Sequence, residues 1–303
     1  MYAQKESGEE MEIQYIPTGL PSLDAAGLLE RGILTIVGGD PGAGKTAWNL
    51  MFLKSAAEWG YSPISFFFED PLHFIADRIT ARSMGESAFK LRRIQLPGLD
   101  IQSRLGRVGE SEDWTQHVLV NDDFKNSGQL LDWLDSNVTE ATGLVTVDYA
   151  QAFDSEDNEK SVERVIARLA WGLNQLAKKK NVAVVLFSQL KTDVKDRGKK
   201  WYDNWRWNNK RDPGEADQDA VEGYRPISGD LQWSSALTQR AKQIIFIFRP
   251  GAWLCAHGVD AKDNHVDCVI AKGNYGPSND FIRFGWDGPQ TRIYEREKRK
   301  KEK

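Results

Sequence analysis

A glycine-rich stretch near the start of the chain carries the residues best suited to chemistry. It reads GGDPGAGKT over residues 38–46, so that Gly39 is followed after four residues by Gly44, Lys45 and Thr46. Glycines let successive backbone N–H groups curl around phosphate oxygens, and a lysine at this spacing reaches the β- and γ-phosphates. The hydroxyl that follows the lysine can ligate Mg²⁺. We therefore predict a nucleoside-triphosphate site made of Gly39, Asp40, Pro41, Gly42, Ala43, Gly44, Lys45, Thr46 and Ala47.

Two acidic residues at the ends of apolar runs complete this chemistry. Asp148 closes the run LVTVD, where an unpaired buried carboxylate is costly, and a shared metal with Thr46 would explain it. Glu69 ends the run ISFFFED and is placed to orient and deprotonate an attacking water. Asp70 is the alternative base because it is adjacent.

These side chains need a scaffold of strands and helices to bring them together. Residues 33–39 read as a strand and 45–59 as the helix that follows the glycine-rich stretch. Apolar runs predict further strands, and amphipathic stretches predict helices between them: strands 64–70, 117–122, 144–150 and 182–188, and helices 71–84, 127–139 and 159–179. This alternation predicts an α/β fold, a mainly parallel sheet flanked by helices.

The last third of the chain has a different pattern. A helix near 230–241 is followed by three closely spaced apolar runs, at 243–248, 266–272 and 281–286. They predict an antiparallel C-terminal extension of the same sheet. We expect residues 1–15 to form a flexible N-terminal segment and residues 294–303, YEREKRKKEK, to form a charged, solvated tail.

Composition narrows the class of protein. The formal net charge is −4, so any contact with nucleic acid must come from a local patch. No run of 18 apolar residues is present, the N-terminus lacks the order of a signal peptide, and there are two cysteines. These features predict a cytoplasmic protein.

One local patch combines positive charge with aromatic rings. The stretch KKWYDNWRWNNKR, residues 199–211, shows no apolar period of 2 or 3.6, so we expect an extended loop over 191–226. Aromatic rings on a basic segment can stack on nucleic-acid bases. The alternative is a surface loop whose tryptophans pack against the protein or a neighbouring subunit.

An ordered set of motifs resembles the RecA-like motor domain of DnaB-type replicative helicases. The resemblance runs from about Ile16 to Arg292, which defines a domain over 16–293, and its specificity lies in the order of the motifs. Beside the glycine-rich stretch they are IPTGLPSLD (16–24), FFFEDPLHFIADR (66–78), VNDD (120–123), VTVDYAQAF (145–153), LFSQL (186–190), RPISGDLQWSSALTQRA (225–241) and IAKGNYGPS (270–278).

The resemblance implies ATP and Mg²⁺ as cofactors and a homo-oligomer, a hexameric ring with ATP between subunits and single-stranded DNA in its channel. Replication proteins are possible partners, and we expect no counterpart of the family's N-terminal domain. It further implies that Lys45 and Thr46 hold phosphate and Mg²⁺, Glu69 is the catalytic base, and Asp148 is the metal-side acid. Gln189 would report the γ-phosphate to the DNA loops, and Lys272 would reach the nucleotide of the adjacent subunit.

Two departures from the family pattern bear on activity. The family's arginine finger is replaced by Asn274, so we expect slow hydrolysis, action by Lys272 alone, or replacement by Arg283 or Arg292. In the DNA-contact stretch, Gln232 and Trp233 stand where the family has arginine and glutamate. In the resembled fold the 191–226 connection faces the channel, so we predict DNA contacts by Lys199, Lys200, Trp201, Trp205, Arg206, Trp207, Gln232 and Trp233.

The preferred hypothesis is an ATP-dependent DNA helicase or translocase acting on single-stranded DNA in replication. The alternative is a non-motor, RecA-like ATPase that binds single-stranded DNA in recombination or annealing, which Asn274 favours. A third hypothesis is a regulatory ATPase that binds only protein partners through its tryptophans.

Overall fold

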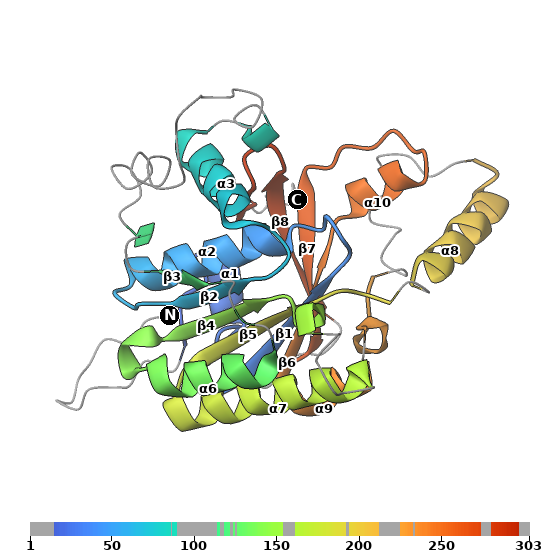
Figure 1. Cartoon of the computed structure of the whole chain (residues 1–303). Coiled ribbons are helices and arrows are strands. Elements are labelled where there is room, and N and C mark those ends of the chain that lie inside the picture. Colours follow the sequence, from blue (N-terminus) through green and yellow to red (C-terminus); the bar gives the residue numbers. More distant parts are fainter. Residues whose placement is uncertain are drawn as a thin grey trace, which may run out of the picture.

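The fold is built on one sheet of nine strands within the part of the chain that the structure describes (Figure 1). The computed structural model describes residues 15–85, 87–89, 114–115, 118–121, 124, 126–153, 161–191, 194–211, 225–232, 234–273 and 280–296. The sheet order is β3-β2-β4-β5-β1-β6-β7-β8-β9. The strands are β1 (Leu34–Gly39), β2 (Ile64–Phe67), β3 (Leu119–Asn121), β4 (Leu144–Asp148), β5 (Ala183–Ser188), β6 (Gln243–Phe248), β7 (His265–Lys272), β8 (Asp280–Asp287) and β9 (Arg292–Glu295).

The first six strands in this order, β3, β2, β4, β5, β1 and β6, are parallel to one another. Strands β7, β8 and β9 continue the sheet in antiparallel pairs. Every residue of β1, β4, β5 and β6 is buried, as expected for parallel strands covered on both faces. The predicted fold class, with its antiparallel C-terminal extension, is confirmed.

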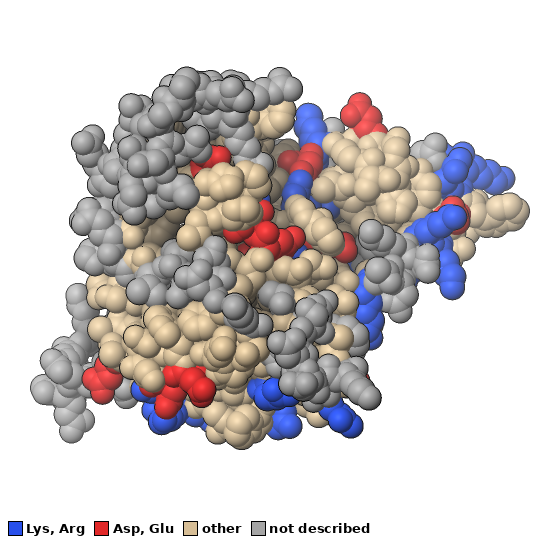
Figure 2. Space-filling model, in the orientation of Figure 1, with Lys and Arg blue, Asp and Glu red and all other residues tan. Residues whose placement is uncertain are grey.

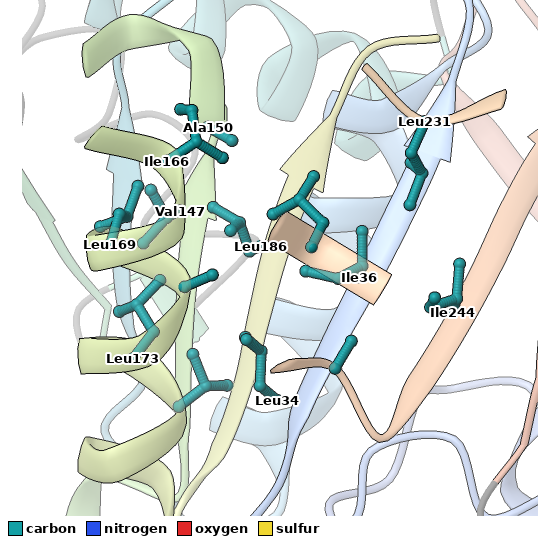
Figure 3. Close-up of a cluster of buried hydrophobic side chains, with 14 of the residues drawn as sticks. Leu34, Ile36, Val147, Ala150, Ile166, Leu169, Leu173, Leu186, Leu231 and Ile244 are labelled. Carbon is teal, nitrogen blue, oxygen red and sulfur yellow. The ribbon is translucent and has the colours of Figure 1, made fainter. Parts of the chain in front are cut away.

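Helices cover the two faces of the sheet in separate layers (Figure 1). One layer contains α6 (Ser127–Asn137), α7 (Val162–Lys180) and α9 (Ser234–Arg240), and the other contains α1 (Pro21–Ala25), α2 (Lys45–Glu58) and α3 (Leu72–Met84). Alternate residues of a strand enter different layers, so Ile36 packs in the first layer and Val37 in the second. Figure 3 shows α7 laying Ile166, Leu169 and Leu173 against the sheet.

Most predicted elements are confirmed to within a few residues, and the differences are these. The strand predicted over 64–70 ends at Phe67, which leaves Glu69 in the turn that follows it. The sequence did not predict α10 (Pro250–Ala256), a short helix that begins at a proline. Strand β9 includes Tyr294 and Glu295, so two residues of the expected tail belong to the sheet.

The loop predicted over 191–226 is wrong in its first half, because residues Val194–Asn209 form the helix α8. The side of α8 that faces the protein carries Val194, Gly198, Trp201 and Tyr202, at spacings of three and four residues. Because the stripe contains a glycine and is surrounded by charged residues, the sequence shows no clear apolar period of 3.6 residues here. Residues 192–193 and 212–224 lie outside the described part of the chain.

No helix among the described residues has the length and apolar character needed to cross a membrane.

A glycine near the end of β1 allows two apolar side chains, Phe246 and Leu231, to pack closely against the strand. A Cβ added at Gly38 would lie 2.6 Å from the Phe246 ring and 2.8 Å from the Leu231 side chain. Gly38→Ala should therefore lower the free energy of unfolding by about 1–3 kcal/mol through overpacking, measured by urea denaturation. Gly229→Ala is the matched control, since a Cβ there meets nothing within 4 Å. Equal effects of the two substitutions would contradict this account.

Candidate active site

The predicted site residues meet where the parallel strands end. The carboxyl ends of neighbouring parallel strands lie at one edge of a sheet, and ligands of α/β proteins bind outside that edge. The glycine-rich stretch runs here from β1 into the first turn of α2. Its Gly44 has a φ of 101°, and a Cβ there would lie 2.9 Å from the Trp286 ring. Both the backbone conformation and the close indole require glycine.

Lys45 is held inside the glycine-rich loop. Its Nζ donates hydrogen bonds to the backbone oxygens of Gly39, at 3.1 Å, and Asp40, at 3.2 Å, and the residue is 6% exposed. Burial lowers the pKa of Lys45, although Asp148, Glu69 and Asp40 oppose this shift. A buried ammonium held by two backbone oxygens of the glycine-rich loop supports the prediction that Lys45 contacts phosphate.

Asp148 is a buried carboxylate with one oxygen available. Thr46 Oγ1 donates to its Oδ2 at 3.3 Å, while Oδ1 has no hydrogen-bond partner among the described residues. Burial raises the pKa of Asp148 to about 7, with Glu69 adding to the shift and Lys45 opposing it. A half-satisfied buried carboxylate beside a hydroxyl fits a hard divalent cation such as Mg²⁺.

Glu69 and Asp70 have different environments, although they are adjacent. The turn that carries them is fixed by the backbone N–H of Phe68, which donates to the Asp148 carbonyl at 2.8 Å. Asp70 Oδ2 accepts from Arg78 Nη1 of α3 at 2.5 Å, so its carboxylate is engaged in an ion pair. Glu69 is exposed, and its charge acts on both Lys45 and Asp148. This geometry favours Glu69 over Asp70 as the acid open to a water molecule.

The end of β5 carries Gln189, which is positioned by a residue that the sequence analysis missed. Gln151 Nε2 donates to Ser188 Oγ at 3.0 Å, and the Gln189 N–H donates to Gln151 Oε1 at 3.4 Å. Gln151 is 7% exposed and lies three residues after Asp148. It therefore connects the end of β4 to the end of β5. The available signal was a second polar side chain three residues after Asp148, just beyond the end of β4.

Arg249 is a second residue that the sequence analysis missed. It follows β6 directly, and its Nη1 donates to the Gly42 carbonyl at 2.5 Å. Its guanidinium also pairs with Asp263 and lies 4.8 Å from the centre of the Trp286 ring. A cavity of about 520 Å³ opens beside it, lined by residues 40–43 of the glycine-rich loop and by α10. An arginine immediately after an apolar strand was the signal that could have identified it.

Lys272 is not brought to the glycine-rich loop of its own chain. It pairs with Ile244 at the amino end of β6, whereas the loop follows the carboxyl end of β1. Its Nζ donates to the Thr238 and Ala241 carbonyls, at 2.9 and 2.8 Å, at the end of α9.

Both residues considered as substitutes for the arginine finger lie on the antiparallel strands β8 and β9. Asp267 binds Arg283 and Arg225 from two sides, at 2.6 and 2.8 Å, so Arg283 is engaged within its own chain. Arg292 is exposed on β9. Asn274 and Trp233 lie outside the described residues.

The predicted DNA-binding residues of α8 separate into two groups. Lys199, Lys200, Arg206 and Trp207 are exposed on the outer side of the helix, and Trp207 is 84% exposed. Trp201 instead packs against Trp253 of α10, with ring centres 5.4 Å apart, so its ring is partly buried against the protein. Trp205 lies between these groups, 6.4 Å from Trp201 and beside the Arg211 guanidinium. Figure 2 shows lysine and arginine side chains gathered over α8 at the end of the molecule.

The sequence matches a known family over more than half of its length. Residues 15–222 match the family described as DnaB-like helicase C terminal domain. The chain belongs to this family. Its relatives include a probable plasmid replicative DNA helicase of Chlamydia psittaci, 26% identical over 86% of this chain and 51% of that protein. The replicative DNA helicase DnaB of Geobacillus stearothermophilus is 22% identical over 88% of this chain and 53% of that protein. The chain thus spans about half the length of these relatives.

Solved structures have the same fold. The structure of a DnaB-like replicative helicase, described together with its interactions with primase, is 18% identical, with a TM-score of 0.73 over 95% of this chain and 63% of that chain. The RadB recombinase is also 18% identical, with a TM-score of 0.55 over 93% of this DnaB-like chain and the whole of that chain. The RecA-like fold is therefore confirmed, and of these two structures the helicase is the more similar.

The environment of Asp148 generates a pH-dependent prediction for the nucleotide-free protein. Its pKa in the folded state is about 7, above the ordinary value of 3.8. At pH values above 3.8, folding must therefore either bind a proton at Asp148 or bury its charge, and both lower the free energy of unfolding. Asp148→Asn removes this penalty. The stabilisation by the substitution should grow from about pH 4 to about pH 7 and remain constant above, measured as the difference in Tm from wild type.

The matched control is Asp135→Asn, at an exposed aspartate. Hydrogen bonding to Lys179 lowers the pKa of Asp135, so its substitution should not stabilise the protein at any pH. A Tm gain for Asp148→Asn that does not change with pH would contradict the assigned pKa.

Proposed function

We propose that this chain is the ATP-hydrolysing motor of a replicative DNA helicase that acts on single-stranded DNA. The observation that carries the proposal is the half-satisfied Asp148 carboxylate beside Thr46 and Lys45, at the sheet edge of a chain of the DnaB-like family. The names of the relatives, replicative DNA helicases, agree with this function.

The arrangement supports phosphoryl transfer to water. Backbone N–H groups of the glycine-rich loop and the Lys45 ammonium bind the phosphates, and Thr46 with Asp148 would hold Mg²⁺. Magnesium, when bound, neutralises phosphate charge. Glu69 orients a water and takes its proton while the water oxygen bonds to the γ-phosphorus and the bond to the β–γ bridging oxygen breaks. Gln189, fixed by Gln151, would contact the γ-phosphate from the end of β5.

The position of Lys272 supports a nucleotide site shared between subunits. Because Lys272 lies at the amino end of β6, it does not serve the glycine-rich loop of its own chain. In the proposed ring, which we take to be a hexamer, it would face the nucleotide of the next subunit.

The outer side of α8 is the proposed contact with single-stranded DNA. Bases stack on exposed aromatic rings without regard to sequence, and lysines and arginines follow the phosphates. Trp207 supplies the exposed ring, and Lys199, Lys200 and Arg206 supply the charge. Trp205, Gln232 and Trp233 stay in this proposal as secondary contacts.

A non-motor ATPase that binds single-stranded DNA is the second candidate. Asn274 favours it, since the family's arginine finger is absent at that position and such a finger contributes about 10³–10⁵ in rate.

Strand displacement separates the two candidates. Wild type should unwind a forked duplex with ATP and Mg²⁺, and Glu69→Gln should bind ATP but show no unwinding and almost no phosphate release, because the amide cannot accept the proton. Asp70→Asn is the matched control and should retain most of the hydrolysis, since Asp70 is paired with Arg78.

The outcomes distinguish the hypotheses. Hydrolysis without unwinding would favour the non-motor ATPase. Normal hydrolysis by Glu69→Gln would instead refute the assignment of the base.

The role of α8 is tested by separating stacking from charge. Trp207→Ala should weaken binding to a poly(dT) oligonucleotide by about 1–3 kcal/mol without changing the salt dependence, because stacking does not release counterions. Lys199→Ala combined with Lys200→Ala should instead flatten the salt slope, by about 0.7 for each phosphate that is no longer bound. Trp171→Ala, at an exposed tryptophan of α7, is the control and should bind normally. Normal binding by Trp207→Ala would exclude stacking on this ring.

A further inference from the structure

The helix α8 is joined to the rest of the molecule by a bidentate ion pair. Arg197 of α8 donates from Nη1 to Asp230 Oδ1 at 2.8 Å and from Nη2 to Asp230 Oδ2 at 2.6 Å. Asp230 is 8% exposed, ends the short helix η5 (Ser228–Asp230) and also accepts the Ile227 N–H at 2.8 Å. Paired, parallel hydrogen bonds fix the orientation as well as the distance of the two groups.

The partner of Arg197 is bonded directly to the segment that carries Gln189. The Gln232 N–H donates to the Gln189 carbonyl at 3.0 Å, and the Lys191 N–H donates to the Asp230 carbonyl at 2.9 Å. Between them, Leu190 and Leu231 form an antiparallel bridge. Residues 189–191 and 230–232 therefore form one short ladder, with Gln189 at one end and the ion pair to α8 at the other.

The second attachment of α8 has a different character. Tyr202 lies 5.4 Å from the His257 ring, and Trp201 and Tyr202 both lie against Trp253 of α10. Contacts between aromatic rings are attractive over a range of orientations, so they hold the helix close without fixing its direction. Of these side-chain contacts, the Arg197–Asp230 pair is the one that fixes an orientation as well as a distance.

We propose that Arg197 is a positioning residue that makes α8 move together with the segment that carries Gln189. The nucleotide at the sheet edge would then control the affinity of α8 for single-stranded DNA. The proposal rests on the proposed function. A ligand shifts a conformation only through contacts that differ between states, and the γ-phosphate near Gln189 is the group that ATP has and ADP lacks. The ladder and the ion pair carry that difference to α8.

Arg197→Gln tests this proposal because it retains most of the side chain and removes the bidentate pair. The measurement is the affinity for a fluorescent poly(dT) oligonucleotide, by anisotropy, with Mg²⁺ and either a non-hydrolysable ATP analogue or ADP. Couplings between sites commonly amount to about 5- to 150-fold, and we expect the ratio of the two affinities in wild type to lie in this range. In Arg197→Gln the ratio should fall to near one, while ATP hydrolysis without DNA stays within about twofold of wild type.

Two further variants separate positioning from stability. Lys179→Gln removes an exposed ion pair with Asp135 and the same charge, and it should keep the wild-type ratio. Arg197→Lys keeps the charge but not the planar fork. It should therefore be closer to wild type in stability than in the ratio of DNA affinities with the ATP analogue and with ADP. If Arg197→Gln does not fold, Arg197→Lys decides the question.

The outcomes for this inference and for the proposed function are distinct. Equal weakening of DNA binding in both nucleotide states would reduce Arg197 to a structural role and overturn the inference. A wild-type ratio near one would also overturn it, since there would be no difference to transmit. Absence of ATP hydrolysis and DNA binding in wild type would instead refute the proposed function.

Discussion

The proposed nucleotide site depends on opposite charges buried together at the end of a parallel sheet. Lys45 and Asp148 are both taken out of water, and burial shifts both of their pKa values toward the neutral form. Buried charges of this kind are tolerated only where surrounding groups hold them firmly. The backbone oxygens of the glycine-rich loop hold the ammonium, and Thr46 holds one oxygen of the carboxylate. Two layers of helices and an apolar sheet keep these groups in place.

The sheet edge also explains why residues distant in sequence act together. Parallel pairing of β4 with β5 brings the segments after these two strands side by side, so Gln151 reaches Ser188 and Gln189. The parallel pairing of β2 with β4 similarly places the turn that carries Glu69 beside Asp148. One arrangement of strands therefore positions the acids and the polar side chain that follows β5.

The parts predicted from sequence are those whose determinants are local. The glycine-rich loop was predicted because its spacing alone fixes its chemistry, and all strands but β9 were predicted because each lies in a short run rich in apolar residues. The helix α8 was not predicted, since its inner side is completed by Trp253 and His257, which belong to a segment some fifty residues further along the chain. Gln151 and Arg249 were missed for the same reason, because their partners are reached only after the sheet has formed.

The tryptophans of the chain give it two built-in optical reporters. Trp286 packs against Gly44 at the start of α2 and lies beneath the Arg249 guanidinium, so its emission responds to the charge and solvent at the glycine-rich loop. Trp207 stands in water at the far end of α8 and senses whatever approaches that helix. Because the two indoles occupy such different surroundings, one buried and one solvated, their emission maxima differ. The chain has eleven tryptophans, so a variant that keeps only Trp286 and Trp207 would report events at the glycine-rich loop and events at α8 separately, without any attached dye.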